Sequence, residues 1–168
     1  MSQRAKTVNW YDELIRLRDE ERKRIEKSTM LMKGKELPLE VNPQGLMKWY
    51  MHPANDETAH KALIICVQEI PPGSKSGKQK YQGGMVIFVI QGEGHSVIDG
   101  KEYPWKANDI VQLPLRPDGV IFQHFNDSSK ETAKFICVEP NLVGALGVDR
   151  GSGFEQLEPA PEYLKKGR

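Results

Sequence analysis

The sequence lacks the features that mark several large classes of protein. It has no uninterrupted apolar run of the about 18 residues that a membrane span needs, and its charged amino terminus lacks the apolar core of a secretory signal. Its 24 Lys and Arg nearly balance 23 Asp and Glu, so the net charge of +1 gives no electrostatic reason to expect nucleic acid. We therefore expect a cytoplasmic protein that binds neither membranes nor nucleic acid.

Cysteine is also scarce. Cys66 and Cys137 each lie inside an apolar run, ALIICV and FICV, where a free thiol behaves as a small hydrophobic side chain. A chain of 168 residues can bury about 70% of its unfolded surface around one core, so it needs no crosslink or metal in order to fold. We expect both thiols to be reduced and buried.

What the sequence does have is a series of short apolar segments between turn residues. The block from residue 62 to 140 includes ALIICVQEI, MVIFVIQ, DIVQLPL, VIFQHFN and AKFICVEP. This spacing is typical of a β-barrel or a β-sandwich. Asp99-Gly100 lies between SVI and KEYPW and predicts a two-residue hairpin turn, since a type I′ turn needs positive φ at both central residues.

The segments that flank this block have a different character. A helix is predicted from Trp10 to about Lys27, with Asn9 as its cap. Trp10, Leu14 and Leu17 form a narrow apolar stripe on this helix, which either binds a partner or is simply a solvated face. We divide the chain into a helical arm (1–33), a wrapping arm with an edge strand near Leu46–Met51 (34–61), a barrel (62–140) and an extended Gly/Pro-rich tail (141–168).

Two segments resemble the motifs of the cupin superfamily. They are PPGSKSGKQKYQGG, followed by Gly92, and PDGVIFQHFN. The resemblance spans about residues 73–126 and implies an all-β fold: a double-stranded β-helix (jelly-roll) barrel with an N-terminal helix and extended N- and C-terminal arms. In metal-bearing cupins this spacing carries histidines and a carboxylate, whereas here the corresponding positions hold Gln79, Tyr81, Met85 and Phe122.

These four residues are poor metal ligands. A glutamine amide is a weak neutral ligand, and a phenol must first lose a proton with an ordinary pKa near 10. Met offers only a soft thioether, and Phe has no donor atom. The resemblance therefore implies that this chain has vacated metal-ligand positions, no catalytic residue and no metal of its own. We expect Ile87, Val89, Gln91, His124 and Asn126 to complete the lining of the vacated cavity, which is either filled as core or open to an aromatic ligand.

Two other arrangements stay open at this point. His124 together with a Tyr81 phenolate could rebuild part of a metal site. Metal-free cupin sugar epimerases use a histidine-aspartate pair with a tyrosine. His124 and Tyr81 could supply the histidine and the tyrosine, but the motifs here hold no matching aspartate. The other histidines, His52, His60 and His95, lie outside the motifs and are expected at the surface or in turns.

The long arms extend the resemblance to function. NPQGLMKWYMHP and GALGVDRGSGFEQLEPAPEY resemble bacterial cupins of aromatic-compound breakdown, and the architecture is similar to the small subunits of hydroquinone 1,2-dioxygenases. That resemblance implies a non-catalytic, structural or regulatory subunit of a heteromeric ring-cleaving dioxygenase. Iron(II) would then reside in a larger metal-bearing cupin partner, and the chain would also pair with itself in the assembly.

Two further functions remain as alternatives. One is a stand-alone cupin oxygenase with an atypical metal site. The other is a metal-free cupin that binds a small aromatic ligand.

Overall fold

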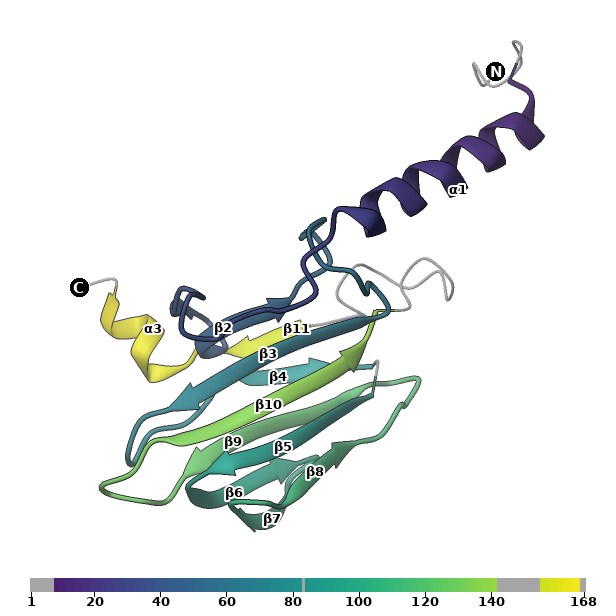
Figure 1. The fold of residues 1–168 in the computed structure, drawn as a ribbon. Coiled ribbons are helices and arrows are strands. Elements are labelled where there is room, and N and C mark those ends of the chain that lie inside the picture. Colours follow the sequence, from purple (N-terminus) through teal and green to yellow (C-terminus); the bar gives the residue numbers. More distant parts are fainter. Residues whose placement is uncertain (1–7, 83, 142–154, 167–168) are drawn as a thin grey trace.

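Two antiparallel sheets enclose the core of the protein (Figure 1). The computed structural model describes residues 8–82, 84–141 and 155–166. One sheet has the strand order β1-β2-β3-β10-β5-β8 and the other the order β11-β4-β9-β6-β7. The elements are α1 (Trp10–Glu26), β1 (Glu40–Asn42), β2 (Gly45–Met51), β3 (Leu63–Ile70), β4 (Lys78–Tyr81), β5 (Met85–Gln91), β6 (Glu93–Ile98), β7 (Lys101–Lys106), β8 (Ile110–Leu113), β9 (Val120–Asn126), β10 (Ala133–Pro140), β11 (Glu155–Glu158) and α3 (Pro161–Lys166).

Alternation along the strands places the apolar side chains between the sheets. In β3 every second residue from Ile64 to Ile70 is buried, and in β10 the same holds from Ala133 to Cys137. Successive side chains of a strand point to opposite faces, so these residues share the inner face. The core contains aromatic rings from both sheets, with Trp105 packed edge-on against Phe135 at a centroid distance of 4.9 Å.

The predicted hairpin is confirmed between β6 and β7. Ile98 lies opposite Lys101, which leaves Asp99 and Gly100 as the two turn residues, with φ of 47° and 80°. A second glycine is needed at the end of β5, where Gly92 has φ of 90° and a Cβ atom would lie 2.9 Å from Cα of Ala133. Any other residue would strain the backbone and push strand β10 away.

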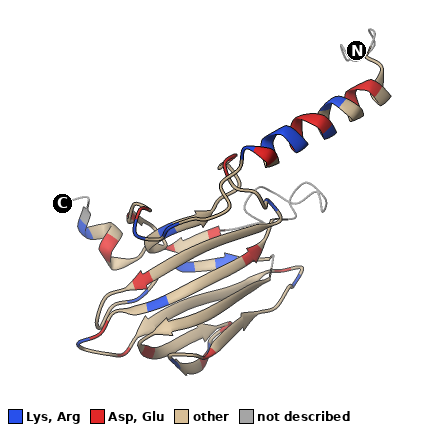
Figure 2. Cartoon of the chain, in the orientation of Figure 1, with Lys and Arg blue, Asp and Glu red and all other residues tan. Residues whose placement is uncertain are grey.

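Helix α1 extends away from the sheets (Figure 1), and none of its residues is buried. It begins where the sequence predicts, because Oδ1 of Asn9 accepts hydrogen bonds from the backbone N–H of Tyr11 (3.1 Å) and Asp12 (3.4 Å). Charged residues of both signs run along it (Figure 2). Trp10, Leu14 and Leu17 are 70%, 63% and 52% exposed, so partner binding by this stripe stays a prediction.

The described part of the carboxyl-terminal tail is more ordered than an extended chain. β11 lies antiparallel to β4 and widens the second sheet, which agrees with the expected extended segment. The tail also contains α3, which the sequence analysis did not predict. Pro161 is its first residue, a position where the fixed φ of proline suits a helix and its missing N–H costs nothing. The rest of the predicted tail, residues 142–154, lies outside the described residues.

Cys66 and Cys137 are free and buried, as predicted, and lie opposite each other on β3 and β10. In the parts of the chain that the structure describes, every helix is too short or too polar to cross a membrane.

Candidate functional site

A cavity of about 620 Å³ lies between the sheets at one end of the barrel. It is bounded by strands β2, β3, β4, β5, β9 and β10 and by the segment that follows β2. The lining residues are Gln44, Met47, Trp49, His52, Pro53, Ala54, Ile64, Cys66, Gln68, Gln79, Tyr81, Met85, Phe122, His124, Cys137, Glu139 and Asn141. A volume of this size is common for pockets that bind small molecules.

The structure brings the four motif positions together in this cavity. Gln79 and Tyr81 point inward from β4, and Phe122 points inward from β9, where it lies opposite Gln79. Met85 lies on the wall at the start of β5. His124, two residues beyond Phe122, also lines the cavity and is 1% exposed. Alternation along β4 and β9 explains why residues far apart in sequence meet here.

Four residues that were predicted to line the cavity do not line it. Ile87 and Val89 lie further along β5, at 0% exposure in the filled part of the core. Gln91 lies at the end of β5 opposite Lys134. Asn126 shares the inward face of β9 but is past the cavity, where its Nδ2 donates to the backbone oxygens of Ile70 (2.9 Å), Pro71 (3.1 Å) and Glu131 (2.8 Å). Its amide therefore joins the end of β3 to the segment between β9 and β10.

A buried hydrogen-bond chain sets the protonation of His124. Nε1 of Trp105 donates to Oγ of Ser96 (2.9 Å), and Oγ of Ser96 lies 2.7 Å from Nδ1 of His124. Because the Ser96 oxygen already accepts from the indole N–H, its hydroxyl proton can be donated to Nδ1, an arrangement that favours the ring proton on Nε2. Burial lowers the pKa of His124 from 6.5 to about 4, so the ring is neutral near pH 7.

Glu139 is a cavity residue that the sequence analysis missed. It follows Cys137 by two positions on β10, and its partly buried carboxyl lines the cavity. Burial raises the pKa of Glu139, and a hydrogen bond from Tyr81 opposes that rise. The signal was present in the sequence, since the alternation of AKFICVEP places Glu139 on the same face as Phe135 and Cys137. A buried carboxyl with a raised pKa in a cavity is a frequent mark of a functional site.

The donor set does not fit the metal that cupin motifs bind. Within residues 8–82, 84–141 and 155–166 no three His, Cys, Asp or Glu side chains gather as a metal site. Tyr81 is engaged with Glu139, and Nδ1 of His124 is held by Ser96. A hard dication needs several anionic or imidazole donors converging on one point, so a metal site rebuilt from Tyr81 and His124 would need Glu139 as its third donor and stays a prediction.

The epimerase-like alternative also lacks its partner residue, because the neighbour of His124 is Ser96 rather than an aspartate. Of the remaining histidines, His52 is exposed beside the cavity and packs edge-on against Trp49. His60 is exposed as expected. His95 lies in β6 rather than in a turn, with Nδ1 2.8 Å from Oδ2 of Asp127.

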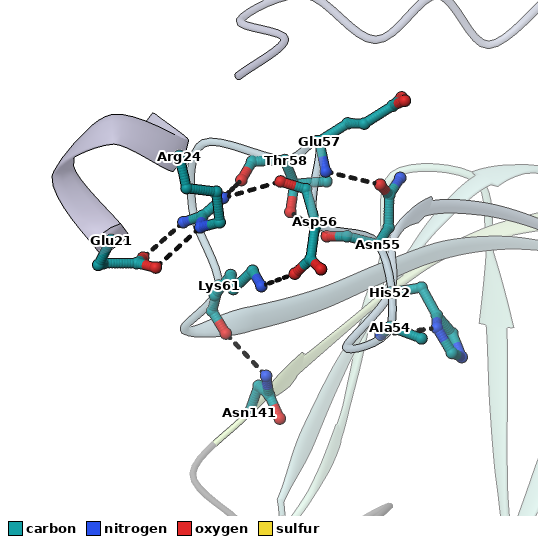
Figure 3. A network of polar contacts seen from close by, with 10 residues as sticks. All are labelled: Glu21, Arg24, His52, Ala54, Asn55, Asp56, Glu57, Thr58, Lys61 and Asn141. Atoms are coloured by element: carbon teal, nitrogen blue, oxygen red, sulfur yellow. Dashed lines mark hydrogen bonds and ion pairs between the residues drawn. The ribbon is translucent and has the colours of Figure 1, made fainter. Parts of the chain in front are cut away.

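A polar network ties helix α1 to the cavity rim (Figure 3). Arg24 forms a bidentate pair with Glu21, and its Nη1 donates to the backbone oxygens of Asp56 (3.0 Å) and Thr58 (2.5 Å). Lys61 pairs with Asp56, and its backbone oxygen accepts from Nδ2 of Asn141 (2.8 Å). The end of the helix is therefore joined to the segment that carries His52 and Ala54 at the rim.

The family comparison agrees with this geometry. Residues 66–139 match a protein-family model described as Cupin domain. Over these residues the barrel is similar to a cupin domain. A protein from Klebsiella pneumoniae with a double-stranded β-helix domain superposes with a TM-score of 0.57 at 17% identity, over 78% of this chain and 99% of that chain. The predicted all-β cupin fold with a jelly-roll barrel is thereby confirmed.

Two curated proteins are similar in sequence to parts of this chain. A 5-aminosalicylate 1,2-dioxygenase of Comamonas sp is 26% identical over 123 residues, which are 73% of this chain and 31% of that protein. An oxalate-binding protein of Thermotoga maritima is 36% identical over 61 residues, 35% of this chain and 50% of that protein. The chain thus spans about a third of the first relative and half of the second.

Proposed function

We propose that this cupin is the non-catalytic, metal-free subunit of a heteromeric ring-cleaving dioxygenase whose larger cupin partner holds iron(II). The observation that carries the proposal is the cavity itself, in which Gln79, Tyr81, Met85 and Phe122 occupy the motif positions that hold metal ligands in metal-bearing cupins. The similarity to a 5-aminosalicylate 1,2-dioxygenase supports the class of partner. The kinship with the small subunits of hydroquinone 1,2-dioxygenases belongs to this proposal as well.

Helix α1 is the surface that we assign to the partner. Trp10, Leu14 and Leu17 are largely exposed on a helix with no buried residue, so the rest of the described chain does not account for this apolar stripe. Aromatic and aliphatic side chains of this kind commonly anchor protein interfaces. The Arg24 network would then connect the docked helix to the rim of the cavity.

The test is to purify the chain alone and after co-expression with the neighbouring genes of its native locus, and to measure metal content and ring-cleaving activity in both. We expect metal and activity only when a larger cupin co-purifies. The double variant Leu14→Asp, Leu17→Asp should abolish co-purification and leave cooperative unfolding of the barrel unchanged. Leu115→Asp is the matched control, since Leu115 is 70% exposed on the barrel. Near-stoichiometric iron in the lone chain would refute the proposal.

A second candidate function is the binding of a small aromatic ligand in the cavity. The specific observation in its favour is that the cavity is open space of about 620 Å³ walled by Trp49, Phe122 and Met85 rather than packed core. Toluene should then raise the melting temperature, since a ligand that binds only the folded state stabilises it. Met85→Trp should remove that shift by filling the space.

A further inference from the structure

We propose that the cavity selects uncharged, hydroxyl-bearing ligands with an apolar body and rejects carboxylates, with Glu139 accepting a hydrogen bond from the hydroxyl group. This inference rests on the second candidate function, ligand binding in the cavity. It concerns the chemical class that the cavity accepts. It makes no assumption about the partner subunit.

The first step is the charge of the cavity wall. Of the side chains that the structure places around the cavity, none is a lysine or arginine, and Glu139 is the one carboxyl group. His124 carries no charge near pH 7, since burial lowers its pKa to about 4. An anionic ligand would lose its hydration, find no lysine or arginine in the lining, and lie near an acidic side chain. Burial of an unpaired charge is strongly unfavourable.

The second step is the hydrogen-bonding pattern. His124 packs against Phe135, with ring centroids 5.3 Å apart, and its Nδ1 is held by Ser96, whereas Glu139 lies four residues beyond Phe135 on β10. Glu139, held against the Tyr81 hydroxyl, offers carboxyl oxygens as acceptors. A hydroxyl group can donate a hydrogen bond to these oxygens, whereas a methyl group cannot.

The third step is the body of the ligand. Met47, Ile64 and Phe122 contribute apolar surface, and Trp49 contributes a ring near the rim. The walls therefore suit a small ring or hydrocarbon, while Glu139 offers the hydrogen-bonding contact. Pockets of this kind bind mainly through apolar contact and orient the ligand through a few polar groups.

Three probes that share one ring separate these contributions: toluene, benzyl alcohol and benzoate. Binding of each to the full chain at pH 7 is measured by titration calorimetry. We expect benzyl alcohol to bind about tenfold more tightly than benzoate, which corresponds to about 1.4 kcal/mol, and several-fold more tightly than toluene. Met85→Trp should weaken all three, which locates them in the cavity.

Glu139→Gln tests the origin of the selectivity, because it removes the charge and keeps an acceptor oxygen. Benzoate should bind this variant about tenfold more tightly than wild type, through loss of like-charge repulsion, while benzyl alcohol changes less. Glu102→Gln is the matched control, since Glu102 is exposed on β7. Tyr81→Phe provides a second variant, which should weaken benzyl alcohol and leave toluene unchanged.

The outcomes distinguish this proposal from the function on which it rests. Benzoate binding at least as tight as benzyl alcohol would overturn charge selection, and toluene binding as tight as benzyl alcohol would overturn hydroxyl recognition. Both results would leave ligand binding in place. If none of the three probes bound, or if Met85→Trp bound them unchanged, the second candidate function would fall together with this inference.

Discussion

The two ends of the barrel interior are built from the same strands yet differ in what they hold. At the filled end the inward residues include Phe135, Val89 and Ile70, each 0% or 1% exposed. At the cavity end β10 and β5 place Cys137 and Met85 inward, further along the same faces. Inward and outward side chains alternate in the same way along the strands at both ends, so the backbone does not create the cavity.

Side-chain size and polarity create it. At the filled end rings and branched aliphatics interlock. The cavity end also has rings, but it combines them with small thiols, a flexible thioether and glutamine amides such as Gln68 and Gln79. Close packing contributes stability that an open cavity cannot, since atoms beside a void lose their contacts. We infer that the filled end stabilises the fold and that the cavity end is the part that can vary with function.

The largest expected effect comes from emptying the filled end. Phe135→Ala should lower the free energy of unfolding by about 4 kcal/mol, because it removes a fully buried ring that packs against Trp105. Met85→Ala on the cavity wall should cost about 1 kcal/mol, since its side chain already borders open space. Denaturant unfolding of both variants measures the difference. Equal losses would mean that the cavity end is packed as tightly as the other.

The sequence predicts which side chains face the interior but not how far along the barrel each of them lies. Asp99-Gly100 and Asn9 act through local backbone geometry, so the hairpin and the helix start follow from a few neighbouring residues. Alternation correctly turns Gln79 and Tyr81 inward. It cannot say how far along the barrel a side chain lies, which is why Val89 and Asn126 were placed in the cavity and are not there.

The cavity also depends on residues outside any motif. Glu139 lies 13 positions beyond Asn126, in a strand that was interpreted only as core. Trp49 and His52 come from the arm before the barrel and were not linked to the site. The role of Ser96 depends on Trp105 and His124 meeting across two strand pairings, a contact between strands that local patterns do not specify.

The second prediction concerns how stability depends on pH through His124, which lies between the cavity and the filled end of the barrel. The folded pKa of His124, about 4, is below its ordinary value of 6.5, so the unfolded state binds the proton first. Stability should therefore fall as the pH drops from about 6.5 to 4, by about 3 kcal/mol from this group. The pH dependence of unfolding should be shallower in His124→Gln by this amount. Parallel curves for the two proteins would contradict the neutral, buried ring.

Glu139 contributes with the opposite sign. Its folded pKa is raised, so the folded state holds the proton more tightly, and stability from this group falls as the pH rises through that folded value. The groups around it are Tyr81 on β4 and the cysteine pair on β3 and β10. Glu139→Gln should therefore steepen the loss of stability toward acid pH, whereas Glu102→Gln should leave the curve unchanged.

A smaller effect is expected from the hydrogen-bond chain at the same boundary. Ser96→Ala removes the partner of both Nε1 of Trp105 and Nδ1 of His124 within the core, so unfolding should cost about 2 kcal/mol less. Ser129→Ala, at an exposed position, is the control and should change stability by less than about 0.5 kcal/mol. Nitrogen chemical shifts of His124 should also report loss of the single Nε2–H tautomer, a change that a mere packing defect would not produce.

The smallest effect is one of access and leaves stability untouched. Cys66 and Cys137 line the cavity, and the pKa of Cys66 is raised well above its usual value by a hydrogen bond with Cys137 and by burial. Little Cys66 thiolate forms, so methyl methanethiosulfonate should label Cys66 slowly, and benzyl alcohol in the cavity should slow the labelling further. Val89→Cys, made with both native cysteines changed to Ser, puts a thiol at the filled end, where labelling should wait for unfolding. Equal rates at the two ends would mean that the reagent enters only by global opening, and the contrast between an open and a filled end would be lost.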